Sequence, residues 1–521
     1  MKTAFKSVKS SLSGLVGNGY AAAVTAACAR LTGRPARDAR RIADTPVEFF
    51  PAAFNRVLVR LLPEIGTPFS RRFGMSRTGA SSGTFNAATH TAMAPLSCLG
   101  YYRVAEDGRL HCATKSEHYH TSVGHAFPGY RLVEYAKLLG MPNATHNNTR
   151  GHVTRLLEEE LVCAANGIDP ADRAAVRRAL AATGGGVLNR VLNLETGSLA
   201  AEAAVKMMLA RFYRVQPGFP RPKYADRTPV FLVLGDDDGG LHANYHGTTM
   251  ITQMLRGMWP GMREELERHN VLRVVALRPN CIGDLEAAFR NYDKGTYKIA
   301  GLCHELIMMN YAARVVSKTF IRRAYQLCRA HDVPTFVDEI QSCMWSPELL
   351  LYREYGLRPS MVALGKGFPG GEYPASRILF TAEMDCLPQF GALVTNGQEE
   401  LASLAYLITM RWARENRDVT RAVGEYYEKR LRALARAHPG AIHSVAGIRH
   451  LCGLCFHDLD TAKAFAAALV RKGFDISVQT YKSDCPPAAL TKLPLIAGYE
   501  LVDVFIDAMA DVLSGTRGRR S

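Results

Sequence analysis

The middle of the chain alternates short apolar runs with longer segments in which apolar residues recur at every third or fourth position. The runs "PVFLVLG", "VLRVVAL", "PTFVDEI" and "MVALG" are typical of buried strands, whereas "VTRLLEEELVCAA" and "FIRRAYQLCRAHD" are typical of helices. This alternation predicts an α/β domain with a mainly parallel sheet. Ligands of such sheets bind beyond the carboxyl ends of the strands, so residues that follow a strand are candidates for a functional site.

Changes in this pattern divide the chain into four parts. Residues 1–95 are expected to form a basic, partly helical N-terminal extension, and residues 96–146 a segment that packs with a small domain. Residues 147–401 carry the α/β pattern and are expected to form the large domain. The helical pattern "GQEELASLAYLITMRWARENRDVTRAVGEYYEKRLRAL" then leads into residues 402–521, which we expect to form a smaller α+β domain.

Charge and composition limit the classes of function. The chain has 521 residues, of which 47% are apolar, and 64 basic against 48 acidic residues give a net charge of +16. Much of this excess lies in the N-terminal arm, because no acidic residue precedes Asp38, and no nucleic-acid-binding motif accompanies it. No run of apolar residues is long enough to span a membrane.

The cysteine content and the N-terminal arm predict the cellular compartment of the protein. The twelve cysteines are scattered, which is typical of reduced thiols in a cytoplasmic protein. The Ala- and Ser-rich, acid-poor arm resembles a mitochondrial transit peptide, so the mitochondrial matrix is the alternative for a eukaryotic source.

One lysine stands in a loop of small residues, "VALGKGFPGGEYPAS". The spelling Gly-x-Gly-x-x-Gly matches a dinucleotide fingerprint, but the loop runs into the strand-like "SRILF" instead of opening a helix. A P-loop is also excluded, because Gly367 follows Lys366 where Ser or Thr is required. A lysine whose small neighbours leave room for a flat ligand is suited to form a Schiff base with a carbonyl compound.

If that carbonyl belongs to pyridoxal 5'-phosphate, the site also needs a carboxylate for the pyridine nitrogen and a cradle for the phosphate. The strand "PTFVDEIQS" delivers Asp338 and Gln341 at its carboxyl end. Thr196, Gly197 and Ser198 precede a strong helical pattern, where free N–H groups favour an anion.

Taken together, these motifs resemble the class III, ornithine aminotransferase-like branch of the fold type I pyridoxal-phosphate enzymes, from about Tyr101 to the C-terminus. The matching segments are "TGSLAAEAAVKMMLAR", "NYHGTT", "FVDEIQS", "ALGKGFPGG" and, near the start, "SVGHAFP". The resemblance implies a large domain with a mainly parallel, seven-stranded type of sheet flanked by helices, plus a smaller α+β domain.

The resemblance also implies roles for individual residues. Lys366 would form the Schiff base and carry protons, and Asp338 would pair with the pyridine nitrogen. Gln341 would bind the 3-oxygen of the ring, Tyr245 would stack on the ring beside His246, and Thr196, Gly197 and Ser198 would hold the phosphate. Thr395 matches a threonine that reaches the phosphate of the neighbouring subunit, which implies a homodimer with shared active sites.

The sequence departs from the family on the side of the substrate. Leu199 replaces a glutamate after the phosphate segment, and Glu305 lacks the proline that usually follows it. Lys492, in "LTKLPL", is the cation nearest to the position of an arginine that grips a substrate carboxylate.

The implied activity is transfer of an amino group between an amine or amino acid and a keto acid or aldehyde. A pyridoxal-phosphate-dependent aminomutase, racemase, decarboxylase or lyase would use the same residues, and a cofactor-binding scaffold with a degenerate substrate site is the non-enzymatic alternative. A cluster of residues near the start could hold a metal ion, namely His118, Tyr119, His120 and His125, but the resemblance already accounts for His125, and we expect no metal site there.

Overall fold

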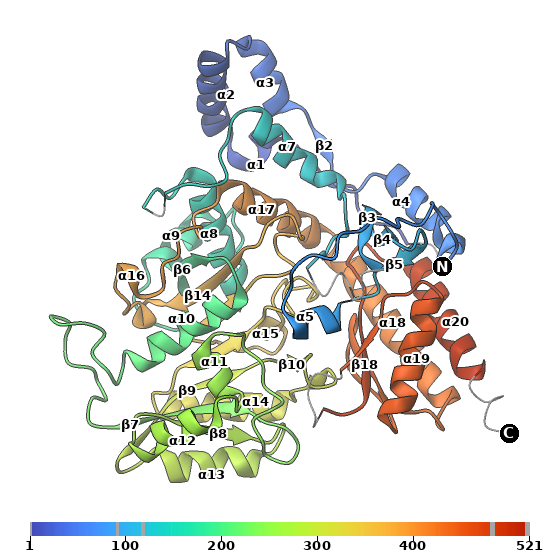
Figure 1. Cartoon of the computed structure of the whole chain (residues 1–521). Coiled ribbons are helices and arrows are strands. Elements are labelled where there is room, and N and C mark those ends of the chain that lie inside the picture. The colour runs from blue at the N-terminus through green and yellow to red at the C-terminus, as the bar shows by residue number, and fades with distance from the viewer. Residues whose placement is uncertain (1–2, 90–92, 116–119, 147, 480–484, 516–521) are drawn as a thin grey trace.

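A seven-stranded sheet forms the centre of the computed structural model, which describes residues 3–89, 93–115, 120–146, 148–479 and 485–515 (Figure 1). Strand β14 is antiparallel to both its neighbours, and the other strands are parallel to one another. The predicted α/β fold with a mainly parallel sheet is confirmed. In order across the sheet the strands are β6 (Leu188–Leu194), β14 (Ser376–Thr381), β13 (Met361–Leu364), β12 (Thr335–Asp338), β9 (Tyr297–His304), β7 (Thr228–Leu234) and β8 (Arg273–Leu277).

Both faces of this sheet are buried, which explains the continuous apolar runs of its strands. Along β7, Phe231 and Val233 belong to the apolar cluster that includes α10 (Gly197–Leu209). The alternate residues Val230 and Leu232 belong to the cluster that includes α8 (His152–Asn166), α13 (Ile282–Tyr292) and α14 (Lys318–Ala330). Helices therefore cover the sheet on both sides.

A second, antiparallel sheet lies in the C-terminal part of the chain. Its order is β15 (Ile442–Ile448), β16 (Leu451–Phe456), β18 (Ala488–Lys492) and β17 (Ser477–Val478). The helices α18 (Arg417–Ala437), α19 (Leu459–Arg471) and α20 (Tyr499–Gly515) lie beside it (Figure 1). The long helical pattern that leads into this region forms two helices, because α17 (Glu400–Glu415) ends before Asn416. The side chain of Asn416 is buried, and its Oδ1 accepts a hydrogen bond of 2.8 Å from the backbone N–H of Lys6.

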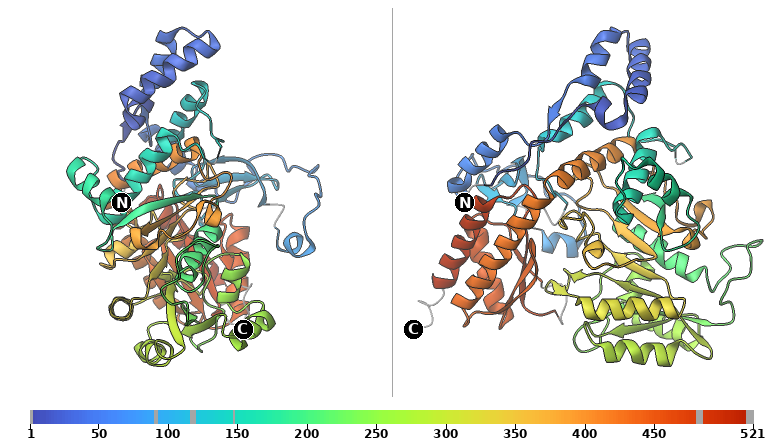
Figure 2. Two further views of the ribbon diagram at one scale, coloured as in Figure 1. Left: turned by 90° about the vertical axis from the view of Figure 1, so that its left-hand side faces the viewer. Right: turned by 180° about the vertical axis from the view of Figure 1, so that it is seen from behind.

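The N-terminal extension contains several helices, and many of its apolar side chains belong to the core. The rings of Phe5 and Phe50 contact the ring of the buried Trp412 at centroid distances of 5.8 and 6.1 Å. Thr3 donates to both carboxylate oxygens of Glu500, at 3.2 and 3.0 Å. Beyond these anchors, α2 (Asn18–Thr32) and α3 (Ala36–Asp44) project away from the rest of the molecule in all views (Figures 1 and 2).

A three-stranded antiparallel sheet follows the N-terminal helices in the chain and lies beside α4 (Ala52–Arg60) and the C-terminal part of the molecule (Figure 1). Its strands are β3 (Pro95–Leu99), β4 (Tyr102–Ala105) and β5 (Leu110–Cys112). The backbones of Cys112 and Phe474 form an isolated parallel β-bridge, which joins this sheet to the C-terminal part of the chain.

The remaining elements are short. They are β1 (Lys9–Ser10), α1 (Leu12–Val16), β2 (Val47–Glu48), α4 (Ala52–Arg60), η1 (Leu62–Glu64), α5 (Gly83–Ala88), η3 (Pro128–Tyr130), α7 (Arg131–Leu138), α9 (Arg173–Ala181), α11 (Met250–Leu255), α12 (Pro260–Arg268), β10 (Ile307–Met308), β11 (Arg314–Val315), α15 (Leu351–Glu354), η4 (Ala382–Met384) and α16 (Gln389–Ala392).

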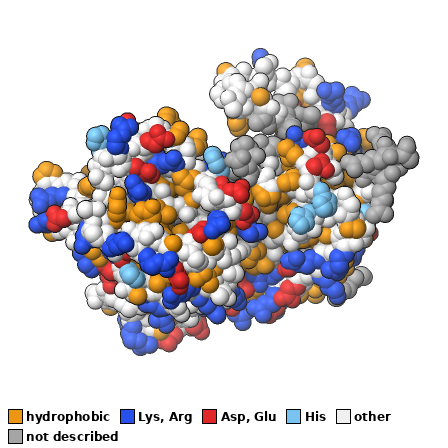
Figure 3. Space-filling view, turned by 90° about the horizontal axis from the view of Figure 1, so that it is seen from below, with side chains coloured by type: hydrophobic (Ala, Val, Ile, Leu, Met, Phe, Trp, Pro, Cys, Tyr) orange, Lys and Arg blue, Asp and Glu red, His pale blue; other side chains and the backbone are white. Residues whose placement is uncertain are grey.

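The surface carries mixed charge on the face seen from below, where Lys and Arg side chains alternate with acidic and apolar ones (Figure 3). Among the described helices, none has both the length and the apolar character needed to cross a membrane.

Glu339 is a fully buried carboxyl in the turn after β12. It accepts hydrogen bonds from the hydroxyl of Ser342 at 2.5 Å and from the backbone N–H of Tyr352 at 2.6 Å. Burial raises the pKa of Glu339 to about 7, although both hydrogen bonds act in the opposite direction.

We predict that Phe50→Ala lowers the free energy of unfolding by about 3–5 kcal/mol, because it opens a cavity among Phe5, Phe127 and Trp412. Urea denaturation followed by circular dichroism measures this change. The matched control is Phe85→Ala, since Phe85 is 67% exposed and its truncation should cost less than about 0.5 kcal/mol. Equal decreases in the free energy of unfolding of the two variants would contradict the conclusion that Phe50 is packed in the core.

We predict that Glu339 contributes to the dependence of stability on pH. The folded chain holds this proton up to about pH 7, whereas an unperturbed glutamate releases it near 4.5, so this carboxyl lowers the free energy of unfolding as the pH rises between these values. The loss reaches about 3 kcal/mol. Glu339→Gln should remove this contribution, so that stability measured by urea denaturation falls less steeply between pH 5 and 8 than in the unchanged protein. An unchanged slope would refute the prediction.

Candidate active site

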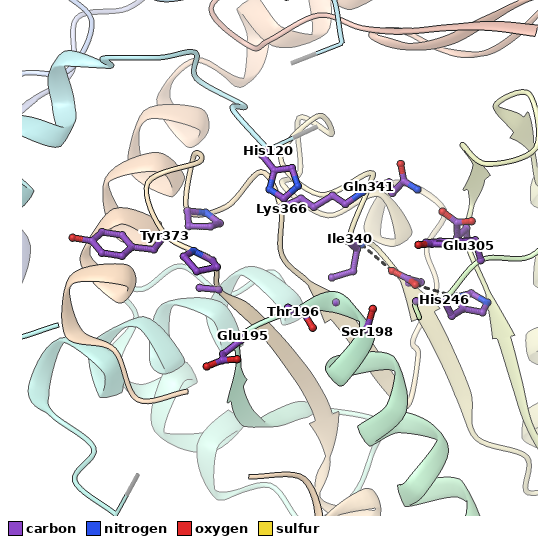
Figure 4. Close-up of a pocket in the computed structure, with 17 residues that line it drawn as sticks. His120, Glu195, Thr196, Ser198, His246, Glu305, Ile340, Gln341, Lys366 and Tyr373 are labelled. Atoms are coloured by element: carbon purple, nitrogen blue, oxygen red, sulfur yellow. Dashed lines mark hydrogen bonds and ion pairs between the residues drawn. The ribbon is translucent and has the colours of Figure 1, made fainter. Parts of the chain in front are cut away.

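A cavity of about 230 Å³ opens beyond the carboxyl ends of the central strands (Figure 4). Residues from five separate stretches of the chain and from His120 form its wall. The lining residues are His120, Glu195, Thr196, Gly197, Ser198, Tyr245, His246, Gly247, Glu305, Asp338, Ile340, Gln341, Lys366, Pro369, Tyr373, Pro374 and Ala375. The structure thus brings together every cofactor-binding residue expected from the sequence except Thr395.

Asp338 ends strand β12 and is 6% exposed. Its Oδ2 lies 3.0 Å from Nδ1 of His246, and its Oδ1 accepts a hydrogen bond of 3.1 Å from the backbone N–H of Ile340. A carboxylate has about four lone-pair sites, so Asp338 can accept a further hydrogen bond from a ligand. Nε2 of His246 is buried and has no hydrogen-bond partner among the described residues.

Lys366 lies in the connection between β13 and β14, and the antiparallel direction of β14 allows this connection to be a short loop. Its φ of 40° lies in the left-handed region, which is rare for a residue with a side chain and is found at functional sites. Burial lowers the pKa of Lys366, while the nearby Asp338 and Glu305 act in the opposite direction. An amine that loses its proton more readily is a better nucleophile.

The glycines around Lys366 serve close packing instead of leaving open space, which corrects our expectation from the sequence. A Cβ on Gly367 would lie 2.7 Å from the Trp345 ring, and one on Gly370 would lie 1.6 Å from the hydroxyl of Tyr130. The space for a ligand beside Lys366 is the cavity itself. The glycines allow the large side chains of Trp345 and Tyr130 to pack against the loop.

The N-terminus of α10 faces the cavity opposite Lys366 (Figure 4). Thr196 is the N-cap residue, and the hydroxyl of Ser198 accepts a hydrogen bond of 3.1 Å from the backbone N–H of Thr248. A Cβ on Gly197 would lie 2.8 Å from Ile340, and one on Gly247 would lie 2.6 Å from Ser198. Glycine at these two positions lets three backbone segments approach closely, which forms a cradle of N–H and hydroxyl groups suited to a phosphate.

The cavity fits pyridoxal phosphate. Asp338 supplies the carboxylate for a protonated ring nitrogen, and the α10 cradle supplies donors for the phosphate. Gln341 is 6% exposed, and its Oε1 has no hydrogen-bond partner among the described residues, so its amide is placed to bind a polar atom of a ligand. Tyr245 also lies on the wall, and Arg256 contacts its ring at 5.2 Å from the centroid.

Several wall residues were not assigned to the cavity from the sequence. Glu195 directly precedes the phosphate segment, and Tyr373 lies within the loop "VALGKGFPGGEYPAS", so their neighbours are the available signal. The sequence offers His120 only as a candidate metal ligand. Burial, and secondarily Lys366, lower the pKa of His120. Glu305 lies on the wall although its usual proline is absent.

Other sequence candidates lie elsewhere. Thr395 is exposed in the loop after α16 and is not part of the wall. Lys492 is buried and also does not line the cavity. His118 and Tyr119 fall outside the described residues, and His125 pairs through its backbone with Gly100. Within the described ranges, no three His, Cys, Asp or Glu side chains are grouped to hold a metal ion.

Comparison with known proteins identifies relatives of this fold and site. The ornithine aminotransferase of Schizosaccharomyces pombe is 30% identical over 203 residues, which are 37% of this chain and 42% of that protein. The diaminobutyrate–2-oxoglutarate transaminase of Vibrio cholerae is 25% identical over 232 residues, 42% of this chain and 55% of that protein. The matched region thus spans about half the length of these curated relatives.

Solved structures share the fold. The ornithine aminotransferase of Toxoplasma gondii, whose structure is described with pyridoxal phosphate at its active site, superposes with a TM-score of 0.64 at 18% identity, covering 84% of this chain and 96% of that one. The fold is therefore that of the fold type I pyridoxal-phosphate enzymes.

The family model for class-III aminotransferases matches residues 145–513, which include every strand of the large sheet and of the C-terminal sheet. Enzymes of this class depend on pyridoxal phosphate, in agreement with the cavity described above. The chain belongs to the class-III aminotransferase family.

Proposed function

We propose that this protein is a pyridoxal-phosphate-dependent aminotransferase that moves an amino group between an amine or amino acid and a keto acid or aldehyde. The observation that carries the proposal is the convergence of Lys366, Asp338 and the N-terminus of α10 on one cavity. When bound, pyridoxal phosphate supplies an aldehyde and an electron-withdrawing ring that acidifies the carbon bearing the amino group.

The side chains of the cavity have separate roles in the proposed reaction. The amine of Lys366 attaches the cofactor and, once a substrate amine replaces it, takes a proton from the substrate carbon and returns it on the other side of the C–N bond. Asp338 holds a proton on the ring nitrogen, and His246 fixes the carboxylate through its Nδ1. Thr196, Gly197 and Ser198 would bind the phosphate, Tyr245 would stack on the ring, and Gln341 would bind the 3-oxygen.

We propose further that the protein is a homodimer with shared active sites, in which Thr395 reaches the phosphate of the partner. The exposure of Thr395 outside its own cavity supports this role. The substrates are small molecules, with no nucleic acid and no membrane as partner. A cytoplasmic location, or the mitochondrial matrix in a eukaryote, completes the proposal.

The alternative reactions on the same residues differ in which bond of the substrate is broken. A screen of amine donors distinguishes them, because transamination alone leaves the cofactor in its aminated form, with loss of the absorbance band of the lysine-bound form. Release of carbon dioxide, an eliminated group or an inverted substrate would instead indicate decarboxylase, lyase or racemase chemistry. A scaffold would bind the cofactor and convert no donor.

We predict that Lys366→Ala abolishes the borohydride-reducible bond between protein and cofactor and lowers amino transfer by at least about 10²–10⁴-fold, because both the attachment and the proton carrier are lost. Mass spectrometry of the reduced protein and a donor assay measure these effects. Lys294→Ala is the control, since Lys294 is exposed. A reducible bond that persists in Lys366→Ala would assign the attachment to another lysine.

We predict that Asp338→Asn keeps the reducible bond to Lys366 but slows amino transfer by about 10²–10³-fold, because the amide no longer stabilises a positive ring nitrogen. Single-turnover absorbance with a converted donor gives the rate. The control Asp332→Asn changes a half-exposed aspartate that pairs with Arg211 at the surface. A rate equal to that of the unchanged protein would exclude Asp338 as the partner of the ring nitrogen.

A further inference from the structure

A second cavity, of about 630 Å³, opens at the edge of the large sheet opposite the active site. Its wall includes Leu188, the first residue of β6, and Pro359, which shortly precedes β13. Because β6 and β13 both run antiparallel to β14, they are parallel to each other, and the active site lies beyond their carboxyl ends. The second cavity therefore lies at their amino ends, and the two cavities share no lining residue.

Much of the wall comes from the stretch between α8 and β6, which supplies no residue to the active-site cavity. This stretch contains α9, which lies beside α8 and β6 at the outside of the molecule (Figure 1). The opposite wall comes from α15 and from the turn that leads into β13. A cavity of this size is large enough for a small organic ligand.

The inner wall of this second cavity is apolar. Ala179, Leu188 and Leu357 line it with buried side chains. The polar atoms nearby are already bonded, because the hydroxyl of Tyr352 donates a hydrogen bond of 2.5 Å to the carbonyl of Ala165. Such a surface favours the apolar part of a ligand, which would leave water when it binds.

Three arginines line the same cavity, and each comes from a different element. Arg178 lies on α9, Arg353 on α15, and Arg358 in the turn before β13. No Asp or Glu is found among the described residues of the wall. Arg178 and Arg358 are exposed, and neither forms an ion pair within the described part of the chain. Arg173, on the same helix as Arg178, differs in that it pairs with a glutamate at 2.5 Å.

Arg353 is held in place by the end of α8. Its Nη1 donates a hydrogen bond of 2.8 Å to the carbonyl of Ala164. Gly167 ends this helix with a φ of 69°, and a Cβ there would lie 2.3 Å from Nη2 of Arg353, so glycine is needed for the guanidinium to lie here. Nη2 also lies 3.6 Å from Glu348, which is outside the second cavity. A guanidinium has five N–H donors, so Arg353 keeps donors for a ligand.

A glycine loop completes the rim. Gly185 and Gly186 line the cavity with φ values of 76° and 69°, and a Cβ on either would meet no atom within 4 Å. These glycines therefore do not serve close packing within the chain. They place bare backbone at the rim, where a ligand can approach it closely.

We propose that this second cavity is a binding site for a small organic anion that carries an aliphatic body, either a carboxylate or a phosphate ester. The charged group lies among Arg178, Arg353 and Arg358, because guanidinium groups bind carboxylate and phosphate oxygens through paired hydrogen bonds. The aliphatic body lies on the apolar wall. The site does not depend on the reaction proposed for Lys366.

The test measures binding of octanoate and octyl phosphate to the full-length protein by isothermal titration calorimetry. At least one of these anions should bind with a Kd of about 1 mM or tighter. Acetate and inorganic phosphate, which lack the aliphatic body, should bind at least about tenfold more weakly. Octylamine, which has the same body and the opposite charge, should not bind at this site. The stronger of the two octyl anions identifies the preferred head group.

Substitutions locate the site. Arg178→Gln and Arg358→Gln should each weaken binding of the octyl anion by about three- to tenfold, because each removes a charged donor at the surface. The matched control is Arg177→Gln, since Arg177 is exposed on the same helix, carries the same charge and does not line the cavity. Its Kd should stay within about twofold of that of the unchanged protein.

Four outcomes would overturn the inference. One is that neither octyl anion binds. A second is binding that Arg178→Gln and Arg358→Gln leave unchanged, which would place the anion elsewhere, the active-site cavity included. A third is an equal loss in Arg177→Gln, which would reduce the effect to net charge. The last is binding of inorganic phosphate or acetate as tight as that of the octyl anions, which would exclude a role for the apolar wall.

Discussion

A carboxylate in a protein interior must be hydrogen-bonded or paired, and the arrangement around Asp338 follows from that requirement. Its two oxygens are held by His246 from the segment after β7 and by the backbone of Ile340. The charge that remains acts on Lys366, which lies at the end of the neighbouring strand β13. One buried charge therefore fixes the register of the turn after β12, the orientation of an imidazole and the environment of the nucleophile.

The direction of one strand makes this geometry possible. If β14 were parallel to β13, their connection would have to cross the sheet, and Lys366 would lie at the start of a long crossover. Because β14 runs in the opposite direction, the loop turns back at the carboxyl edge and packs on Trp345 and Tyr130. The packing of Trp345 and Tyr130 against the loop is consistent with the positive φ of Lys366, because such a conformation persists only where the surrounding structure enforces it.

Much of this could be predicted from the sequence where local chemistry determines structure. Strands β7, β12 and β13 are apolar runs buried on both faces, β8 is an apolar run that is half-buried at the edge of the sheet, and the site motifs follow strand ends. The sequence pattern does not predict strand β6, because polar residues such as Asn189 and Asn193 interrupt its apolar run. Both side chains are buried, and they donate hydrogen bonds to groups in other elements of the chain. The place of Lys492 could not be inferred either, since its partners Gln341 and Trp345 are far away in the chain. Long-range contacts leave no local pattern.

The contact between Thr3 and Glu500 has a consequence for synthesis of the protein. These residues are 497 positions apart in the chain, so the contact forms only after the segment that carries α20 has been synthesised. Until then Phe5 and Phe50 lack the neighbours that cover them in the finished molecule, including Trp412. In a partly synthesised chain these two rings therefore lack part of their apolar contacts, and transiently exposed apolar surface of this kind favours aggregation.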